Sequence, residues 1–439
     1  MPGPLRPVIR VRGGRKLNSV RVMGTEMRTL DESDVAEWVR ALNVGFYRGS
    51  SVTDQEVALR RPGYDLDRTR GVFEGDRCVA TLRSMPRELT VPGGAAVDAS
   101  AVTNVSVTGT HRRRGLASRM MAADLADAKA RGNPVSILIA AEYPIYGRYG
   151  FGPATWTAQW EIDLPRAALD HRYPGPAEGR VDLVGPAEVR KAGPELHERV
   201  RALTPGAINR TPEFWEVNTG EREFSAGSWK EPYFAVYRDA DGRIDGLAAY
   251  DIQDQDWPDK LPNVRASVRG LTAATPAAEI ALWRFLFSLD WVIQVKSGFR
   301  PPDDLLPLLL GDPRAARMAS IADFMWLRIL DVPAALTARR YAGAATSLVL
   351  DVHDRAGFAA GRFLLETDAA GAAVCRPAAG TADADLSLDV ADLACLYLGD
   401  ESALRLAALG RLTEHRPAAA ASADTLFRTP RRPWCPDVF

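Results

Sequence analysis

The first 160 residues alternate between apolar and polar positions with periods that predict a helix, a run of strands, a second helix and a further strand. Residues 31–34 are acidic and precede apolar positions at three- and four-residue steps, which is the pattern of a capped amphipathic helix. Alternation between turns that contain Gly or Pro predicts the strands. The predicted elements are a helix after 31–34, strands over 71–76, 78–91 and 97–107, a helix over 115–131 and a strand over 135–140.

One strand–turn–helix segment of this series points to a ligand. Residues 102–107 are apolar and β-branched enough for a buried strand, and Arg112-x-x-Gly115-x-Ala117 follows them. Gly115 lets the backbone approach a ligand closely, and the amides of residues 113–118 are the unpaired donors of a helix N-terminus. A helix start with positive potential is a site for an anion, above all for phosphate. A solvated helix cap is the alternative interpretation of the spacing alone.

This turn resembles the pyrophosphate loop of the GNAT acyl-CoA N-acyltransferases, whose pattern is Arg/Gln-x-x-Gly-x-Gly/Ala after a strand. The order of the predicted elements also resembles the GNAT fold, with its chemistry where the last two parallel strands splay apart. The resemblance implies acetyl-CoA as the co-substrate. We expect the backbone of Val105, Ser106 and Val107 to pair with the pantetheine arm, Arg112, Arg113, Arg114, Gly115, Leu116, Ala117 and Ser118 to hold the pyrophosphate, and Ala141 and Glu142 to line the thioester side.

Residues 140–154 interleave glycines with aromatic residues, which suggests a tight turn around a pocket. We expect Tyr149 and Phe151 to anchor this loop to the core. For Tyr146 we predict a chemical role as general acid. A phenol with a pKa of about 10 is able to protonate a departing thiolate, because the pKa of a thiol is only about 8.5.

Two sequence segments indicate a narrower family within the GNAT enzymes: His-Arg-Arg-Arg-Gly-Leu at 111–116 and Ile-Tyr-Gly-Arg-Tyr-Gly-Phe-Gly-Pro-Ala at 145–154. They resemble the Eis-type (enhanced intracellular survival) N-acetyltransferases, and the similarity continues through the chain from about residue 27. The resemblance implies an α/β (α+β) protein with two tandem GNAT-like acyltransferase domains followed by a sterol-carrier-protein-like α+β domain. The expected domains are an N-terminal GNAT domain over 23–160, a central GNAT-like domain over 161–318 and a sterol-carrier-like domain over 319–439.

The central unit contains a strand from Val264 and a capped apolar helix that starts at Thr275, but no Arg-x-x-Gly turn. We therefore expect a degenerate copy that has the fold and binds no coenzyme A. In the third unit we expect strands near 346–353 and 360–367, helices near 389–397 and 402–409, and connectors at the alanine-rich segments 369–372 and 418–423.

The chain ends Arg-Arg-Pro-Trp-Cys-Pro-Asp-Val-Phe, and so many apolar residues at a terminus suggest docking. In the Eis family the carboxylate of the terminal Phe enters the active site and acts as the base, so the resemblance assigns this role to Phe439. Burial raises the pKa of a carboxyl group, which makes it a better base than it is in water. The alternative is a hydrophobic end that only packs.

Composition argues against several other classes of protein. A formal net charge of −1 argues against a dedicated nucleic-acid binder or a polybasic membrane protein, and no run approaches about 18 apolar residues. The four cysteines form no CxxC pair, which is typical of reduced thiols in a cytoplasmic protein, and five scattered histidines argue against a metal enzyme. Residues 1–22 are basic with no acid, and we expect a disordered arm or an over-long translation start ahead of Met23 or Met27.

The predicted function is direct acetyl transfer from acetyl-CoA to a primary amine, which is an aminoglycoside, a small amine or a lysine side chain. Asn104 and Val438 stand where some relatives have an aromatic residue and an acid, and Phe46-Tyr47-Arg48 brings in positive charge. These departures disfavour polycationic aminoglycosides. The resemblance also implies a homohexamer, a trimer of dimers. The alternatives are a non-catalytic lipid- or acyl-CoA-binding carrier that uses the C-terminal domain, and an assembly scaffold.

Overall fold

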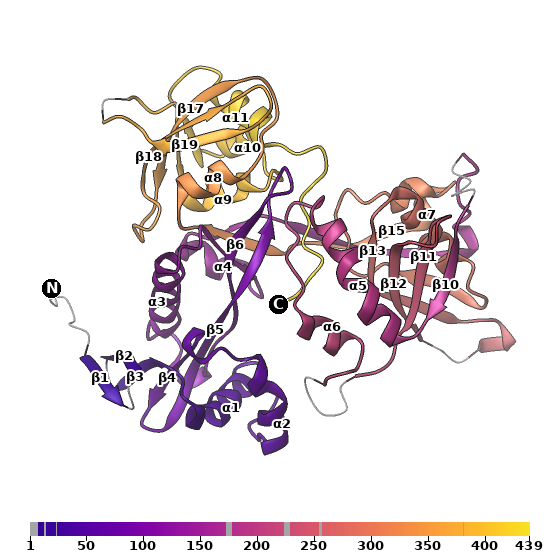
Figure 1. Cartoon of the computed structure of the whole chain (residues 1–439), viewed down its shortest axis with the longest axis horizontal. Helices are drawn as coiled ribbons and strands as arrows, with labels where there is room; N and C mark the ends of the chain where they lie inside the picture. The colour runs from indigo at the N-terminus through magenta and orange to yellow at the C-terminus, as the bar shows by residue number, and fades with distance from the viewer. Residues whose placement is uncertain are drawn as a thin grey trace.

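Three β-sheets organise the chain, one in each of three lobes (Figure 1). The computed structural model describes residues 8–12, 15–22, 24–172, 178–223, 229–253, 257–380 and 382–439. The largest buried cluster is shared between the first and third lobes, because Leu89 and Ile137 pack in it together with Leu348 and Leu393. Among the described residues, no helix has both the length and the apolar character that crossing a membrane requires.

The first sheet has the strand order β1-β2-β3-β4-β5-β6-β7-β16-β8. Its strands are β1 (Val8–Arg12), β2 (Arg15–Val22), β3 (Thr25–Thr29), β4 (Thr69–Glu74), β5 (Arg77–Thr90), β6 (Ala96–Val107), β7 (Val135–Ile139), β8 (Gly152–Pro153) and β16 (Met325–Ile329). Its helices are α1 (Val35–Gly45), α2 (Asp54–Arg60), α3 (Leu116–Ala130) and α4 (Tyr143–Tyr146). The elements expected from periodicity over residues 31–140 are confirmed.

Helices α1 and α3 cover opposite faces of this sheet. A capping box between Asp31 and Asp34 precedes α1, as the acidic residues predicted. Neighbouring residues of β4 point to opposite faces. Val72 packs in the cluster that contains Met120 of α3, and Phe73 packs in the cluster of α1. The strands between the helices are therefore buried on both sides.

The sheet opens between β6 and β7, which run parallel. Residues 99–102 of β6 pair with 135–138 of β7, but β6 continues to Val107 after this pairing has ended. Asn104 has φ of 54°, and the register of β6 against β5 shifts after Thr81. Strand β6 thus has a bulge just past its last pair with β7. The edge of β6 that follows has no partner from β7, which confirms the predicted splay.

The second sheet has the order β10-β11-β12-β13-β14-β9-β15. Its strands are β9 (Trp156–Asp163), β10 (Arg180–Val184), β11 (Tyr233–Arg238), β12 (Ile244–Gln253), β13 (Val264–Ala273), β14 (Val292–Lys296) and β15 (Ala316–Asp323), and its helices are α5 (Pro186–Arg201), α6 (Pro212–Asn218) and α7 (Pro276–Phe287). Strand β13 leads into α7, whose first turn is capped by the Thr275 side chain. The strand and capped helix predicted here are confirmed.

The third sheet has the order β19-β18-β17-β20-β21. Its elements are α8 (Val332–Ala338), β17 (Thr346–His353), β18 (Gly361–Thr367), β19 (Ala373–Pro377), β20 (Leu386–Asp389), α9 (Val390–Tyr397), α10 (Ala403–Ala408), β21 (Leu412–Glu414) and α11 (Ala419–Phe427). The predicted connector at 418–423 is wrong, because this segment begins α11, and Ala419, Ala420 and Ala423 are buried there. Alanine has a high helix propensity and packs closely against a core, so its abundance did not mark a linker.

The basic N-terminal segment also differs from its prediction. Strands β1 and β2 pair antiparallel, and β2 continues the first sheet beside β3. Residues 1–7, 13 and 14 lie outside the described residues. The backbone groups at the edge of β3 form hydrogen bonds with β2. The basic composition that led to the prediction of disorder carries no information about this backbone pairing.

Strand membership also cuts across the expected domain boundaries at 160 and 318. Strand β9 starts at Trp156 but belongs to the second sheet, and β15 continues to Asp323 in that sheet. Strand β16 lies inside the expected sterol-carrier domain, yet it joins the first sheet between β7 and β8. The chain therefore returns to the first lobe and completes its sheet before it enters the third.

Candidate active site

The turn before α3 has the backbone geometry of an anion-binding loop. Gly115 has φ of 72° and Arg113 has φ of 63°, so both are left-handed, and α3 begins at Leu116. Amides in the first turn of a helix have no intrahelical carbonyl to bind, so those of Leu116, Ala117 and Ser118 face the space ahead of the helix. Leu116 is itself buried and fixes the helix end to the core. The turn thus presents a cradle of backbone donors.

Three exposed arginines, Arg112, Arg113 and Arg114, surround these donors. The Arg112 guanidinium donates to the Tyr47 hydroxyl at 3.4 Å and to the Val107 carbonyl at 3.5 Å, which ties it to the end of β6. Arg113 and Arg114 form no ion pair within the described part of the chain. Free guanidinium groups beside a helix N-terminus suit a diphosphate, so these residues fit the coenzyme that the sequence predicted.

The free edge of β6 lies beside this turn. Val105, Ser106 and Val107 are half-buried on it, and the Ser106 hydroxyl forms a hydrogen bond of 2.8 Å with that of Thr81. A Cβ at Gly45 would collide with Ser106 Oγ, so glycine at the end of α1 lets the helix approach the strand this closely. Unpaired backbone groups at such an edge are able to bind an extended chain as an added strand.

Tyr146 closes helix α4, which follows the carboxyl end of β7. Its side chain is 8% exposed and packs edge-on against Phe151, with ring centroids 6.3 Å apart. Burial raises the pKa of Tyr146, so the phenol stays protonated over a wide range of pH. Its hydroxyl has no hydrogen-bond partner among the described residues. A buried, protonated and unpaired phenol suits a proton donor.

The loop around Tyr146 is fixed to both the core and the turn. Phe151 is fully buried, and the Tyr149 hydroxyl lies 3.1 Å from Ser118 Oγ in the first turn of α3. These contacts confirm the predicted anchoring role of Tyr149 and Phe151. Ala141 and Glu142 are exposed between β7 and α4, at the end of the opened sheet.

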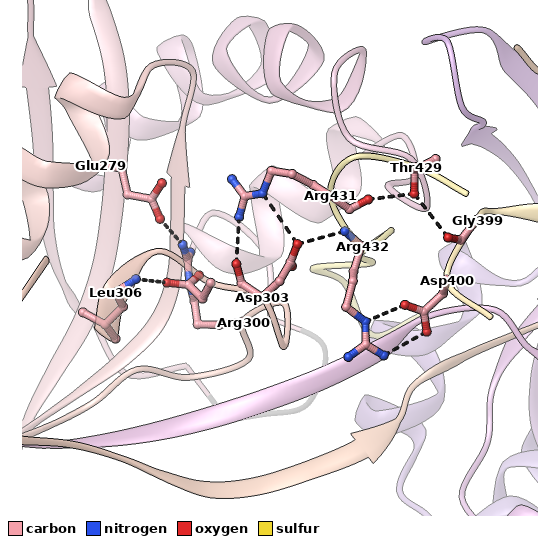
Figure 2. Close-up of polar contacts among 10 residues, drawn as sticks. Glu279, Arg300, Asp303, Leu306, Gly399, Asp400, Thr429, Arg431 and Arg432 are labelled. Atoms are coloured by element: carbon pink, nitrogen blue, oxygen red, sulfur yellow. Dashed lines mark hydrogen bonds and ion pairs between the residues drawn. The ribbon is translucent and has the colours of Figure 1, made fainter. Parts of the chain in front are cut away.

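The C-terminal segment crosses between the second and third lobes before it reaches the site (Figures 1 and 2). The Arg432 backbone donates to Asp303 of the second lobe at 2.9 Å, and its guanidinium pairs with Asp400 of the third lobe at 2.5 Å. The Trp434 amide donates to the Pro205 carbonyl at 2.8 Å. These contacts confirm that the chain end is docked.

Beyond Trp434 the chain end enters a pocket of about 590 Å³ that residues of the first and second lobes line. Asp437 is 6% exposed, and its Oδ1 accepts from Arg210 of the second lobe, with Nε at 2.9 Å and Nη2 at 2.8 Å. Phe439 is half-buried and lines the pocket. Its terminal carboxylate forms no ion pair with any residue that the structure describes.

The register of the strands shows that this pocket lies beside the point where β6 and β7 separate. Ser84 of β5 lines the pocket and pairs with Val102, the last residue of β6 that pairs with β7. The pocket thus meets the sheet at the level where β6 and β7 part. Tyr146 does not line the pocket and packs in a different cluster from Phe439. The two predicted catalytic groups belong to different walls of the opening.

Reasoning from the sequence did not identify four charged residues of this pocket, Arg83, Arg87, Arg210 and Asp437. The four-residue spacing of Arg83 and Arg87 on a predicted strand was a usable signal, because such positions share a face. Arg210 and Asp437 lie 227 positions apart, so no local pattern reports their contact. The described residues contain no group of three or more His, Cys, Asp or Glu able to hold a metal ion.

Known proteins share this architecture. Models of the acetyltransferase (GNAT) domain match residues 26–154 and 206–329, and a model of the sterol carrier protein domain matches residues 332–436. An uncharacterized N-acetyltransferase of Streptomyces avermitilis is 55% identical over 94% of this chain and 98% of its own length. The N-acetyltransferase Eis of Mycobacterium tuberculosis is 38% identical over 78% of this chain and 81% of its own length.

A solved structure extends the similarity to three dimensions. The crystal structure of Eis1 from Mycobacterium abscessus is 31% identical and covers 94% of this chain and all of its own, with a TM-score of 0.80. The turn, the splayed strands and the domain order lead to the same assignment. The chain belongs to the Eis-type N-acetyltransferases, acyltransferases with two GNAT domains and a sterol-carrier-like C-terminal domain.

Proposed function

We propose that the protein transfers an acetyl group from acetyl-CoA to a primary amine by direct attack. One observation supports this most strongly. A cradle of helix amides, a free strand edge and a pocket lined by the last residue of the chain all lie around the end of the β6–β7 pairing. A transferase of this kind needs a coenzyme on one side of the opening and an amine on the other.

The coenzyme side uses backbone groups. The amides of residues 113–118 bind the pyrophosphate, with Arg112, Arg113 and Arg114 adding positive charge, and the edge at 105–107 pairs with the pantetheine arm. Ala141 and Glu142 lie on the thioester side. Holding both substrates in register contributes several kcal/mol, up to about 7–11 kcal/mol in ideal cases.

The amine side uses the chain end. The Phe439 carboxylate takes a proton from the acceptor ammonium, directly or through water, and the free amine attacks the thioester carbonyl. The new C–N bond forms as the C–S bond breaks, and Tyr146 gives its proton to the departing thiolate. The pKa of Tyr146 is raised by burial, so the donor is protonated when it is needed.

Three further features follow from the same family likeness. We propose that the central domain binds no coenzyme A, because β13 leads into α7 without a glycine turn. We also propose a cytoplasmic homohexamer, a trimer of dimers. Light scattering combined with size-exclusion chromatography measures the mass, and a monomer in solution would exclude the hexamer.

The experiment that tests the mechanism adds one glycine after Phe439. The addition converts the terminal carboxylate into an amide and moves the charge by about 3.5 Å. We expect kcat/KM for the amine to fall by about 100-fold or more, with unchanged binding of acetyl-CoA. The matched control adds one glycine before Met1, which leaves Phe439 as the last residue.

Two results would contradict the proposal. Unchanged turnover in the extended variant would remove the carboxylate from the mechanism. Binding of acyl-CoA without release of thiol, with every amine in a broad panel, would favour the carrier alternative.

A further inference from the structure

Two arginines share one face of β5 inside the pocket that holds Phe439. Side chains alternate along a strand, so Arg83, Met85 and Arg87 point the same way, and all three line the pocket. The two guanidinium groups thus bracket an apolar side chain. Both arginines are partly buried.

Neither arginine has an acidic partner within the described part of the chain. Arg83 donates to the Gly63 carbonyl at 2.5 Å and lies over the Tyr64 ring at 5.0 Å, but its buried Nε has no hydrogen-bond partner. Arg87 donates to its neighbour, the Pro86 carbonyl, at 2.8 Å. Burial lowers the pKa of both groups, and the charges of Glu213 on both and of Asp437 on Arg87 only partly oppose this shift.

The acids of the same pocket each form an ion pair elsewhere. Asp437 pairs with Arg210 at 2.8 Å, Glu213 with Arg222 at 3.2 Å and Asp65 with Arg68 at 3.9 Å. The terminal carboxylate of Phe439 forms no ion pair with Arg83, Arg87 or any other described residue. Two arginines and one carboxylate around the pocket therefore lack an ion pair within the described part of the chain, so cations outnumber carboxylates among these groups.

From this imbalance we propose that the acceptor is an amine that also carries an anionic group, a carboxylate or a phosphate, which binds between Arg83 and Arg87. The inference rests on the proposed amine acetylation, and it names the class of acceptor. The ammonium of such a molecule faces the Phe439 carboxylate while its anion faces the arginines. Planar guanidinium groups bind carboxylate and phosphate through two parallel hydrogen bonds, and such charge-assisted bonds are among the stronger ones. A polycation without an anionic group meets two uncompensated positive charges instead.

The test compares matched acceptors that differ in the anion alone. Lysine against 1,5-diaminopentane reports a carboxylate, and O-phosphoethanolamine against ethanolamine reports a phosphate. Turnover is followed as thiol release at constant ionic strength. We expect the preferred acceptor that carries the anion to exceed its matched partner without the anion by about 10-fold or more in kcat/KM.

Substitutions of Arg83 and Arg87 test whether these two residues cause the preference for an acceptor with an anion. Arg83→Gln and Arg87→Gln are expected to raise KM for the acceptor that carries the anion by about 10-fold. Neither variant is expected to lower kcat/KM for the matched acceptor without the anion, because each removes a positive charge that repels it. Arg83→Lys and Arg87→Lys keep the charge without the planar fork and are expected to be intermediate. Arg77→Gln is the matched control, because Arg77 is exposed on the same strand outside the pocket.

The outcomes separate this inference from the function on which it rests. Equal turnover of matched acceptors, or a preference that survives both glutamine variants, would overturn the anion site but leave amine acetylation intact. Absence of turnover with every amine would defeat the proposed function. In that case calorimetric titration of the unmodified protein and of Arg83→Gln with lysine and O-phosphoethanolamine still tests the anion site. Absence of binding to the unmodified protein would overturn the anion site, and so would binding to Arg83→Gln that is as tight as binding to the unmodified protein.

Discussion

The ion pair between Arg210 and Asp437 holds the last residues of the chain in the proposed acceptor pocket, and Asp437→Asn tests this role. The substitution keeps the shape of the side chain and removes its charge. The pair is largely shielded from water, with side-chain exposures of 12% and 6%, and both Nε and Nη2 of Arg210 contact one oxygen. Arg210 also lies 4.4 Å from the Phe214 ring, so its position is fixed independently of Asp437.

The free energy that Asp437→Asn is expected to cost follows from this geometry. Two unit charges about 4 Å apart attract by about 4 kcal/mol at an effective dielectric constant of about 20, and desolvation offsets part of this. Removal of one partner from a buried pair costs about 3–5 kcal/mol, because the other charge stays buried and unpaired. A loss of 3 kcal/mol in docking changes the ratio of docked to detached chain ends by roughly 150-fold.

We therefore expect Asp437→Asn to lower kcat/KM for the amine by about 10- to 100-fold, with KM for acetyl-CoA within about 2-fold of the unmodified protein. Hydrogen exchange of residues 434–439 is expected to become faster in parallel. The double variant Arg210→Gln/Asp437→Asn is expected to lose less than the sum of the two single losses, since the second change has no interaction left to remove.

A matched control is Asp312→Asn, which alters the exposed pair of Asp312 with Arg166 in the second lobe. We expect no measurable change in stability and none in turnover, because the pair is exposed to water. Unchanged turnover in Asp437→Asn would refute the reasoning. A parallel loss of acetyl-CoA binding would also refute it, because that would indicate general damage to the first lobe.

Three further changes test other parts of the structure. Tyr146→Phe is expected to lower kcat by about 100-fold or more with unchanged KM for acetyl-CoA. Because burial raises the pKa of Tyr146 above the ordinary value of about 10 for a phenol, its protonated form persists to higher pH, and a loss of wild-type kcat from its ionisation below pH 10 would contradict its role as acid. Gly115→Ala meets open space, but its φ of 72° strains any other residue by about 1–2 kcal/mol, so calorimetry should show coenzyme A binding weakened by about 5- to 30-fold. Asp354→Ala leaves Arg328 unpaired in a site where the two side chains are 2% and 0% exposed, and denaturant unfolding should show a loss of about 3–5 kcal/mol, whereas a loss below about 1 kcal/mol would contradict the burial argument.

Local physics explains what could be predicted. The strand over 346–353 was expected and is found with the same limits, because its side chains alternate between the core and the surface. The helix after 115 was expected because its apolar positions recur on one face and a glycine precedes it. Gly115 was assigned a special backbone conformation from its place in the turn, and its φ is positive.

The wrong predictions concern segments whose local sequence is compatible with two different structures. An alanine-rich run was predicted to be a connector, yet α11 buries it because small side chains allow close helix packing. A basic segment was predicted to be disordered, yet its backbone pairs at the edge of the first sheet. In both cases a distant partner decides the outcome.

By itself, the sequence determined most of the helices and strands, the glycine turn before α3 and the family, because each depends on residues that are neighbours along the chain or on recognisable short motifs. Only the tertiary structure decided that β16 completes the first sheet, that Arg210 pairs with Asp437 across 227 positions, and that Arg83 and Arg87 line the pocket of Phe439 without an ion pair to any described residue. These arrangements depend on contacts between residues far apart in the chain. Their energy comes from burial and charge compensation, which exist only once the lobes have packed together.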